Sequence, residues 1–254
     1  MRVSTAQLVG QEVSDAGGPR ALRPRVHPEP GMTTTATDAS AFVPERGGLR
    51  ALARAASDCR GCELYERATQ TVFGAGPARA EVVLVGEQPG DVEDRQGAPF
   101  VGPAGRVLDR ALADAGIVRD SVYLTNAVKH FRWKPAARGK RRIHEKPDAR
   151  HVAACRPWLS AELTVIRPHG VVALGATAAH ALFGGGFRLT AHRAELLDWP
   201  PQRGPYAGDE LPVRWAAATV HPSAILRVDP GDRKHAYQEF VRDLRTIARE
   251  LTPP

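Results

Sequence analysis

Three polar residues stand at or just past the ends of apolar runs whose composition is typical of buried strands. They are Glu87, Asn126 and His221. Right-handed crossovers bring the carboxyl ends of parallel strands to one edge of a sheet, where ligands bind in open α/β folds. We therefore expect the three side chains to converge on one cleft.

A carboxylate, an amide and an imidazole in one cleft are groups that can break an N-glycosidic bond. The Asn126 amide presents a donor and an acceptor side by side, which matches the edge of a flipped-out base. The His221 N–H can stabilise a base that leaves as an anion, and Glu87 can balance positive charge that develops on the sugar. Phe100 offers a stacking face. Ordinary structural roles remain open, because a strand-end Asn often caps a turn and His-Pro-Ser is a common tripeptide.

Strands and helices alternate along the chain. Apolar runs predict strands at Val82–Val85, Val122–Ala127, Gly170–Leu174 and Trp215–Val220. Helices are expected at Leu49–Ala56, Gly105–Ala115, Asp148–Ile166, Ala176–Phe183 and Arg233–Leu251, with a kink or restart at Pro157. This order predicts an α/β protein with three layers, α/β/α, around a central, mostly parallel four-stranded sheet.

The turn after the first strand carries much of the polar chemistry. It breaks at Gly86 into GEQPGD and continues through carboxylates that include Asp91. These carboxylates are too many for a phosphate cradle, and no Gly-Lys-Ser/Thr follows. An acidic loop that only begins a helix is the alternative interpretation.

Positive charge is concentrated between Lys129 and Arg150. The segment holds nine Lys or Arg against Glu145 and Asp148, an excess that equals the +7 of the whole chain. Pro135, Gly139 and Pro147 indicate that much of it is loop. A cluster of this kind is the electrostatic footprint of a nucleic-acid-binding surface, although a merely solvated basic loop would have the same composition.

The remaining composition limits the class of protein. The 254 residues, 43% of them hydrophobic, suffice for one domain with a buried core. Residues 1–46 are rich in Pro, Gly, Ser, Thr and Ala and are expected to form a disordered tail, followed by the folded domain at 47–254. Without a membrane-spanning run or a signal-like N-terminus, we expect a cytoplasmic protein. We also expect a monomer, because no extended apolar stripe is left unassigned. Cys59 and Cys62, with Cys155, are too few for a disulfide framework and indicate ligands or redox groups.

Two long motifs resemble a known family. GEQPGDVEDRQGAPFVGPAG resembles the first motif of the iron-sulfur uracil-DNA glycosylases, and HPSAILR resembles their second. TNAVK is similar to the strand that carries their uracil-reading Asn. The insertion KRRIH resembles one branch of that superfamily, the covalent uracil-DNA-binding glycosylases called UdgX. The resemblance covers roughly residues 49–251.

The resemblance implies a base-excision DNA repair enzyme, a hydrolase that remains crosslinked to DNA. In the UdgX branch the His of KRRIH, here His144, attacks the sugar after the uracil bond breaks. Proximity lets such an imidazole outcompete water. Glu87 and His221 would complete the catalytic set, and the residues implied for uracil binding are Gln88, Phe100, Asn126 and Asp91. Those implied for DNA binding, by phosphate contact or by positioning the loop, are Lys140, Arg141, Arg142, Ser223 and Arg227.

The resemblance also implies a [4Fe-4S] cluster. Its ligand positions match Cys59, Cys62 and Cys155, and His130 stands where the usual family pattern has a fourth Cys. Residue chemistry alone leaves zinc open, since three Cys and one His is an accepted zinc ligand set.

Three other interpretations remain for the chain as a whole. A conventional glycosylase would turn over with His144 idle. A non-catalytic uracil-DNA or single-strand binding protein would need only the basic segment. A zinc protein of unrelated function would account for the Cys and His residues.

Overall fold

The computed structural model describes residues 38–139 and 141–251. Its central sheet has five strands in the order β2-β1-β5-β7-β6. The strands are β1 Val82–Gly86, β2 Val122–Asn126, β5 Gly170–Leu174, β6 Leu197–Asp198 and β7 Trp215–Thr219. All pair in parallel except β6, which lies antiparallel at the edge. The predicted mostly parallel sheet is confirmed with one strand more than expected, because two residues are too few to show a period.

The strand register aligns the carboxyl ends of the parallel strands. Gly86 pairs with Asn126 across β1 and β2, and Leu174 pairs with Thr219 across β5 and β7. The residues that follow these strands therefore share one edge of the sheet. The core strands β1, β2 and β5 are buried along their whole length, as expected for a parallel sheet covered on both faces.

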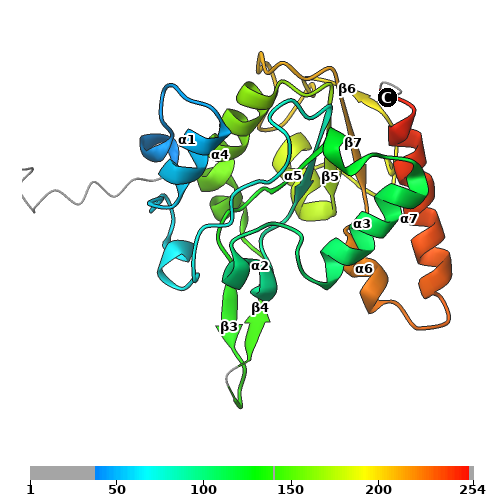
Figure 1. Cartoon of the computed structure of the whole chain (residues 1–254), viewed down its shortest axis with the longest axis horizontal. Coiled ribbons are helices and arrows are strands. Elements are labelled where there is room, and N and C mark those ends of the chain that lie inside the picture. The colour runs from blue at the N-terminus through cyan, green and yellow to red at the C-terminus, as the bar shows by residue number, and fades with distance from the viewer. Residues whose placement is uncertain (1–37, 140, 252–254) are drawn as a thin grey trace, which may run out of the picture. The chain divides into compact units, whose positions relative to one another are not determined.

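Helices cover both faces of the sheet, so the predicted three layers are confirmed (Figure 1). One face packs against α3 (Pro103–Ala115), α6 (Pro222–Arg227) and α7 (Arg233–Ala248). The other packs against α4 (Ala149–Ile166) and α5 (Ala176–Phe183). Alternate residues of β1 enter the two cores, Val82 and Leu84 on one side and Val83 and Val85 on the other. Helix α4 continues through Pro157 without a restart.

A third cluster of buried side chains lies where α1 (Leu49–Ala56) packs on α4. Residues 38–46, expected to be part of the tail, contribute to it. Ala39 is 1% exposed, its N–H donates to Ala154 O at 2.8 Å, and a 3-10 helix follows at Ser40–Phe42. The folded part of the chain therefore begins earlier than composition indicated, because these few apolar residues find a surface to pack against. The rest of the expected tail lies outside the described residues.

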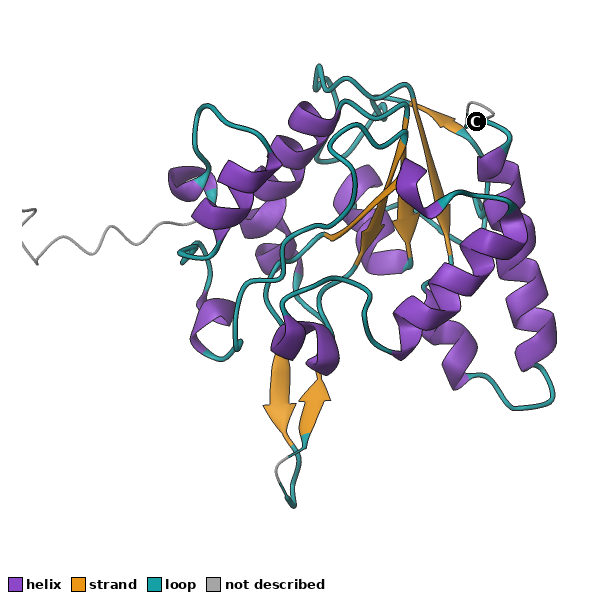
Figure 2. Cartoon of the chain, in the orientation of Figure 1, coloured by secondary structure: helices purple, strands orange, loops and turns teal. Residues whose placement is uncertain are grey.

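Much of the basic segment is loop, as expected, but it also contains a short hairpin. Strands β3 (Trp133–Pro135) and β4 (Arg142–His144) pair antiparallel, with Trp133 opposite His144. Figure 2 shows the hairpin extending from the carboxyl edge of the main sheet, beside the short helix α2 (Asp91–Gln96). Among the described residues no helix is long and apolar enough to cross a membrane.

A buried ion pair supports the end of β2. Lys129 Nζ lies 2.6 Å from Glu162 Oε2, and the side chains are 1% and 0% exposed. The ammonium also donates to Thr125 Oγ1 at 2.6 Å and to Asn126 O at 2.9 Å. Tyr123 donates to Glu162 Oε1 at 3.0 Å. These hydrogen bonds compensate two buried charges and hold the backbone of Asn126 in place.

We expect Glu162→Ala to lower the free energy of unfolding by about 3–5 kcal/mol, because Lys129 would remain buried without its counter-charge. Urea denaturation followed by circular dichroism measures the change. Glu239→Ala is the matched control, since it removes a helical Glu from the exposed pair with Arg242 and should cost at most about 1 kcal/mol. Equal losses in the two variants would contradict the assignment.

Candidate active site

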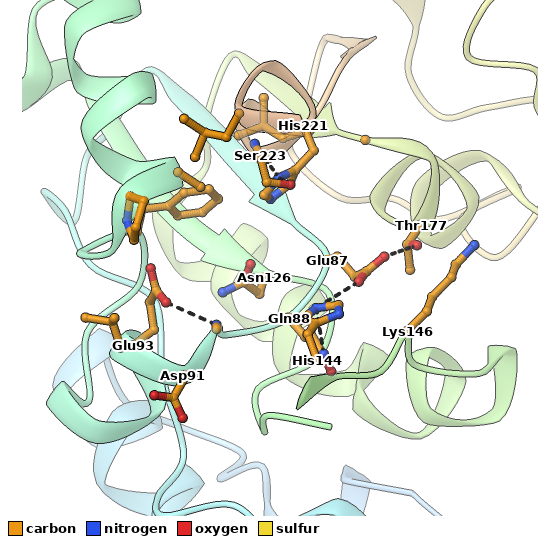
Figure 3. Close-up of a pocket in the computed structure, with 18 of the residues that line it drawn as sticks. Glu87, Gln88, Asp91, Glu93, Asn126, His144, Lys146, Thr177, His221 and Ser223 are labelled. Carbon is orange, nitrogen blue, oxygen red and sulfur yellow. Dashed lines mark hydrogen bonds and ion pairs between the residues drawn. The ribbon is translucent and has the colours of Figure 1, made fainter. Parts of the chain in front are cut away.

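A cavity of about 860 Å³ opens at the carboxyl edge of the sheet. Most of the residues selected from the sequence meet there, and Figure 3 shows how their side chains lie around it. Those that line it are Glu87, Gln88, Asp91, Phe100, Asn126, Arg141, His144, His221, Ser223 and Arg227. The expected convergence of Glu87, Asn126 and His221 is therefore observed.

The absence of a side chain at Gly86 makes room for the innermost part of the cavity. A Cβ at this position would lie 2.3 Å from Asn126 Oδ1 and 2.7 Å from Phe100 Cζ. Both distances are too short for any larger residue. The last residue of β1 therefore lets the amide and the aromatic ring approach each other beside the sheet.

Phe100 is held in an unusual backbone conformation. Its φ is +56°, a value that non-glycine residues rarely adopt, and its ring is 8% exposed. Its carbonyl passes so close to Gly105 that a Cβ there would lie 1.6 Å from it. Glu93 secures the same loop, accepting from Gly102 N at 2.8 Å and from Gly90 N at 3.1 Å. The ring stacks on His221, with centroids 6.0 Å apart.

His221 is held as a neutral donor. Its Nδ1 accepts the backbone N–H of Ser223 at 3.1 Å, so in the neutral ring the proton is on Nε2. Burial lowers the pKa of His221 to about 4, with smaller contributions from Arg227 and His144. The ring can therefore donate a hydrogen bond into the cavity without carrying a charge.

His144 extends from the end of β4 toward Glu87. Its Nε2 lies 3.3 Å from Glu87 Oε1 and 2.9 Å from Gln88 Nε2, and its side chain is 49% exposed. The carboxylate accepts from a protonated Nε2, whereas the amide nitrogen donates to an unprotonated one. Thr177, at the start of α5, donates to the other oxygen of Glu87. Glu87 is thereby oriented with one oxygen directed at the imidazole.

Gln88, beside Glu87, contacts the backbone at both ends of the hairpin. Its Nε2 donates to Glu145 O at 2.9 Å and Arg132 O at 3.2 Å, and its Oε1 accepts from Arg132 N at 3.0 Å. These three backbone contacts fix the orientation of the amide. They engage both polar atoms of the side chain within the protein.

The Arg142 side chain is surrounded by acceptors within the protein. Its guanidinium is paired with Asp91 and Asp94, donates to Thr69 Oγ1 at 3.1 Å, and is 10% exposed. It also lies over the ring of Trp133, 5.5 Å from the centroid. Every nitrogen of the side chain has an acceptor, so Arg142 anchors β4 to α2. Asp91 is correspondingly engaged, and the Arg142 and Arg95 guanidinium groups lower its pKa against the opposing effect of burial.

Three residues of the site were not selected from the sequence. Thr177 and Lys146 line the cavity, and Glu93 braces its loop. Thr177 lies just past the third parallel strand, so the strand-end rule that selected Glu87 could have found it. The other two depend on contacts that no local pattern indicates. Lys140 lies outside the described residues.

Cys59 and Cys155 belong to one buried cluster with Trp158, and the partly buried Cys62 packs against it. Trp158 Nε1 donates to Cys59 Sγ at 3.2 Å, and the Lys129 N–H donates to Cys155 Sγ at 3.3 Å. Such donors commonly stabilise metal-bound thiolates. Burial raises the pKa of Cys155 to about 12, so this thiol ionises only with a cation beside it.

His130 is buried near this cluster, one residue after Lys129. Thr71 donates its hydroxyl proton to Ala56 O at 2.8 Å, so its oxygen accepts from His130 Nε2 at 2.8 Å. Burial lowers the pKa of His130 to about 4, and the neutral ring then carries its lone pair on Nδ1. A ring that donates through one nitrogen and offers the other is the usual state of a metal-binding histidine.

Within residues 38–139 and 141–251, no group of three or more His, Cys, Asp or Glu side chains is arranged to hold a metal ion. The four expected ligands are suitable in chemical type, and His130 is in the neutral form that binds metal, but no three of them are arranged to hold a metal ion.

The fold and cavity define an open α/β protein with a polar ligand site at a sheet edge. The chain belongs to the uracil DNA glycosylase superfamily, whose family model matches residues 73–245. It is 39% identical over 199 residues to the Type-4 uracil-DNA glycosylase of Archaeoglobus fulgidus, covering 77% of this chain and 89% of the relative. It is 33% identical over 193 residues to that of Thermotoga maritima, covering 76% and 90%.

We expect His221 to stay neutral, with its proton on Nε2, when the pH falls from 7 to about 5.5, because its folded-state pKa is about 4 rather than 6.5. Nitrogen-detected NMR of the imidazoles measures this state, with His221→Asn to assign the signals. The unfolded chain takes up this proton near pH 6.5. The contribution of His221 to stability is therefore complete above that pH and declines toward pH 4. A doubly protonated ring at pH 5.5 would contradict the prediction.

Proposed function

We propose that this protein is a uracil-DNA glycosylase that excises uracil from DNA and stays attached to the resulting sugar through His144. The activity is that named for its Type-4 relatives. The observation that carries the proposal is the meeting of Asn126, Glu87, His221 and His144 at one cavity. Neither a binding module nor a zinc protein of unrelated function needs this combination.

Each group has a defined part in excision. The Asn126 amide pairs with the edge of uracil, and Phe100 stacks on the ring. As the bond between the sugar and the base breaks, its electron pair leaves with uracil. The Nε2–H of neutral His221 stabilises the resulting anion without transferring a proton, and the carboxylate of Glu87 balances the positive charge on the sugar.

The crosslinking step follows from the contact between His144 and Glu87. Glu87 takes the proton from His144 Nε2, and the freed electron pair forms a bond to the anomeric carbon. The products are a neutral alkylated imidazole, a neutral Glu87 carboxyl and a uracil anion, so charge and protons balance. An alkylated imidazole is a poor leaving group, which makes hydrolysis slow.

Two features of the hairpin support this step over turnover with water. The contact of 3.3 Å between His144 Nε2 and Glu87 Oε1 holds the nucleophile at the reacting side of the cavity. Gln88 and Arg142 secure both strands of the hairpin by interactions that engage all their polar side-chain atoms. A hairpin that only gripped DNA would not need its histidine directed inward.

DNA binding is assigned to the cations that remain free around the cavity. Arg141 and Arg227 line it and form no ion pair with a carboxylate within the described part of the chain, so they are suited to phosphate groups. Ser223 contributes indirectly, because its backbone N–H donates to Nδ1 of His221 and so orients the imidazole. Lys140 is assigned to DNA binding from the sequence alone.

We further propose that Cys59, Cys62, Cys155 and His130 hold a [4Fe-4S] cluster, with zinc as the less favoured group. The donors to sulfur and the neutral state of His130 support metal ligation in general. The resemblance of the sequence favours iron-sulfur. When bound, the cluster would supply structural crosslinking and no step of the reaction. His130 precedes β3 by two residues, so the ligands would tie the base of the hairpin to α1 and α4.

We expect a uracil-containing oligonucleotide to give a protein–DNA band that survives a denaturing gel and disappears in His144→Ala. The variant should still release free uracil, because the Glu87, Asn126 and His221 groups remain. His192→Ala is the matched control and should crosslink normally, since His192 pairs with Glu195 outside the cavity. Uracil release without a band in the unaltered protein would mean a conventional glycosylase. DNA binding without uracil release would mean a non-catalytic module.

We expect His130→Ala to lower the crosslinking rate at least about tenfold, because a displaced hairpin base would misplace His144. Iron content and the visible absorbance of the purified protein are measured beside the rate. A variant that crosslinks at the normal rate after losing its metal would refute the link between this site and the hairpin.

A further inference from the structure

A second cavity, of about 600 Å³, adjoins the cavity that holds Glu87 and His144, which we call the reaction cavity. The two cavities share Lys146 and Thr177. Figure 3 shows these two residues on the side of Glu87 that faces away from Asn126. The second cavity is therefore a continuation of the first, beyond the point where the sugar of a bound nucleotide would react.

Helix α4 presents one face to this cavity. The lining positions are Ala149, Val152, Ala153 and Arg156, spaced i, i+3, i+4 and i+7. The side chains at the first three positions are small, so they leave open space beside the helix. Arg156 is exposed, and its Nη1 donates to Pro205 O at 3.0 Å.

Helix α5 presents a face with the same spacing. Its lining positions are Thr177, His180 and Ala181, followed by Gly184 just past the end of the helix. Pro147 and Pro205 complete the apolar part of the wall. Two facing helices with small residues at the matching positions thus form a groove large enough for one base and its sugar.

The charge of the groove suits an anionic ligand. Lys146 and Arg156 are cationic, and neither forms an ion pair with a carboxylate in the described part of the chain. Asp148 is the one carboxylate among the described lining residues, and it is paired with Arg132 at 2.5 Å and Arg150 at 3.4 Å. The unbalanced charge is therefore positive.

We propose that this groove binds the nucleotide next to the target uridine in the same DNA strand. This inference rests on the proposed function, because it takes uridine as the occupant of the first cavity. Lys146 lies where the cavities meet and pairs with the phosphate that joins the two nucleotides. The neighbouring base packs against the small side chains of α4 and α5. The enzyme would then hold two successive nucleotides of one strand.

The test measures binding to single-stranded oligonucleotides that carry 2′-fluoro-2′-deoxyuridine, whose glycosidic bond resists cleavage. One carries all its bases, one lacks the base 5′ to the uridine, one lacks the base 3′ to it, and a control lacks a base four positions away. We expect removal of one neighbouring base, and not of the other, to raise Kd about tenfold. This factor corresponds to the loss of roughly 60 Å² of buried base surface. The control should bind normally.

Ala153→Trp fills the groove from an exposed position. It should weaken binding of the complete oligonucleotide about tenfold and abolish the further loss on removing the neighbour. Thr164→Trp, an exposed site farther along α4, is the control and should bind as the unaltered protein does. Arg156→Ala provides a second variant that removes a charge without adding bulk, and it should weaken binding by a smaller factor.

Two results would overturn the proposal. One is a Kd that is insensitive to both neighbouring bases. The other is a neighbour effect that persists unchanged in Ala153→Trp, which would mean that the base binds elsewhere. Because the analogue is not cleaved, these measurements do not depend on excision or crosslinking. Failure of the proposed chemistry would appear only in the separate denaturing gel.

Discussion

The side-chain amide of Gln88 joins the sheet edge to the hairpin, and the geometry of the reaction cavity depends on that junction. It bonds the backbone at Arg132 and Glu145, so both ends of the hairpin are tied to the residue that follows Glu87 in the chain. Arg142 adds a largely buried ionic anchor between β4 and α2. Hydrogen bonds and ion pairs that are shielded from water restrict the hairpin to a narrow range of positions. His144 is therefore directed at Glu87, although it comes from a hairpin outside the main sheet.

Burial determines the chemical state of the groups around this junction. Desolvation keeps His221 neutral, and its contact with the Ser223 N–H selects the tautomer that donates into the cavity. Thr177 fixes the direction of the Glu87 carboxylate. The cavity therefore has a carboxylate that can stabilise positive charge on one side and an uncharged N–H that can stabilise negative charge on the other. This arrangement suits a bond that breaks with separation of charge.

The same helices that cover the sheet also extend the cavity. The faces of α4 and α5 that line the second groove carry mainly small residues, so the helices leave space between them instead of closing it. Lys146 lies at the boundary, following the hairpin and preceding α4. The hairpin, His130 and the lysine shared by the two cavities thus all lie in the segment between β2 and α4.

The sequence by itself determined the α/β architecture, the parallel strands and the convergence of Glu87, Asn126 and His221. Those features follow from apolar periodicity and from the handedness of crossovers, which are local or general rules. Only the tertiary structure decided that the basic segment contains a hairpin, that Gln88 and Arg142 anchor it, and that Thr177 supports Glu87. These depend on contacts between residues tens of positions apart, and the partner of a polar side chain is set by packing that no single segment encodes.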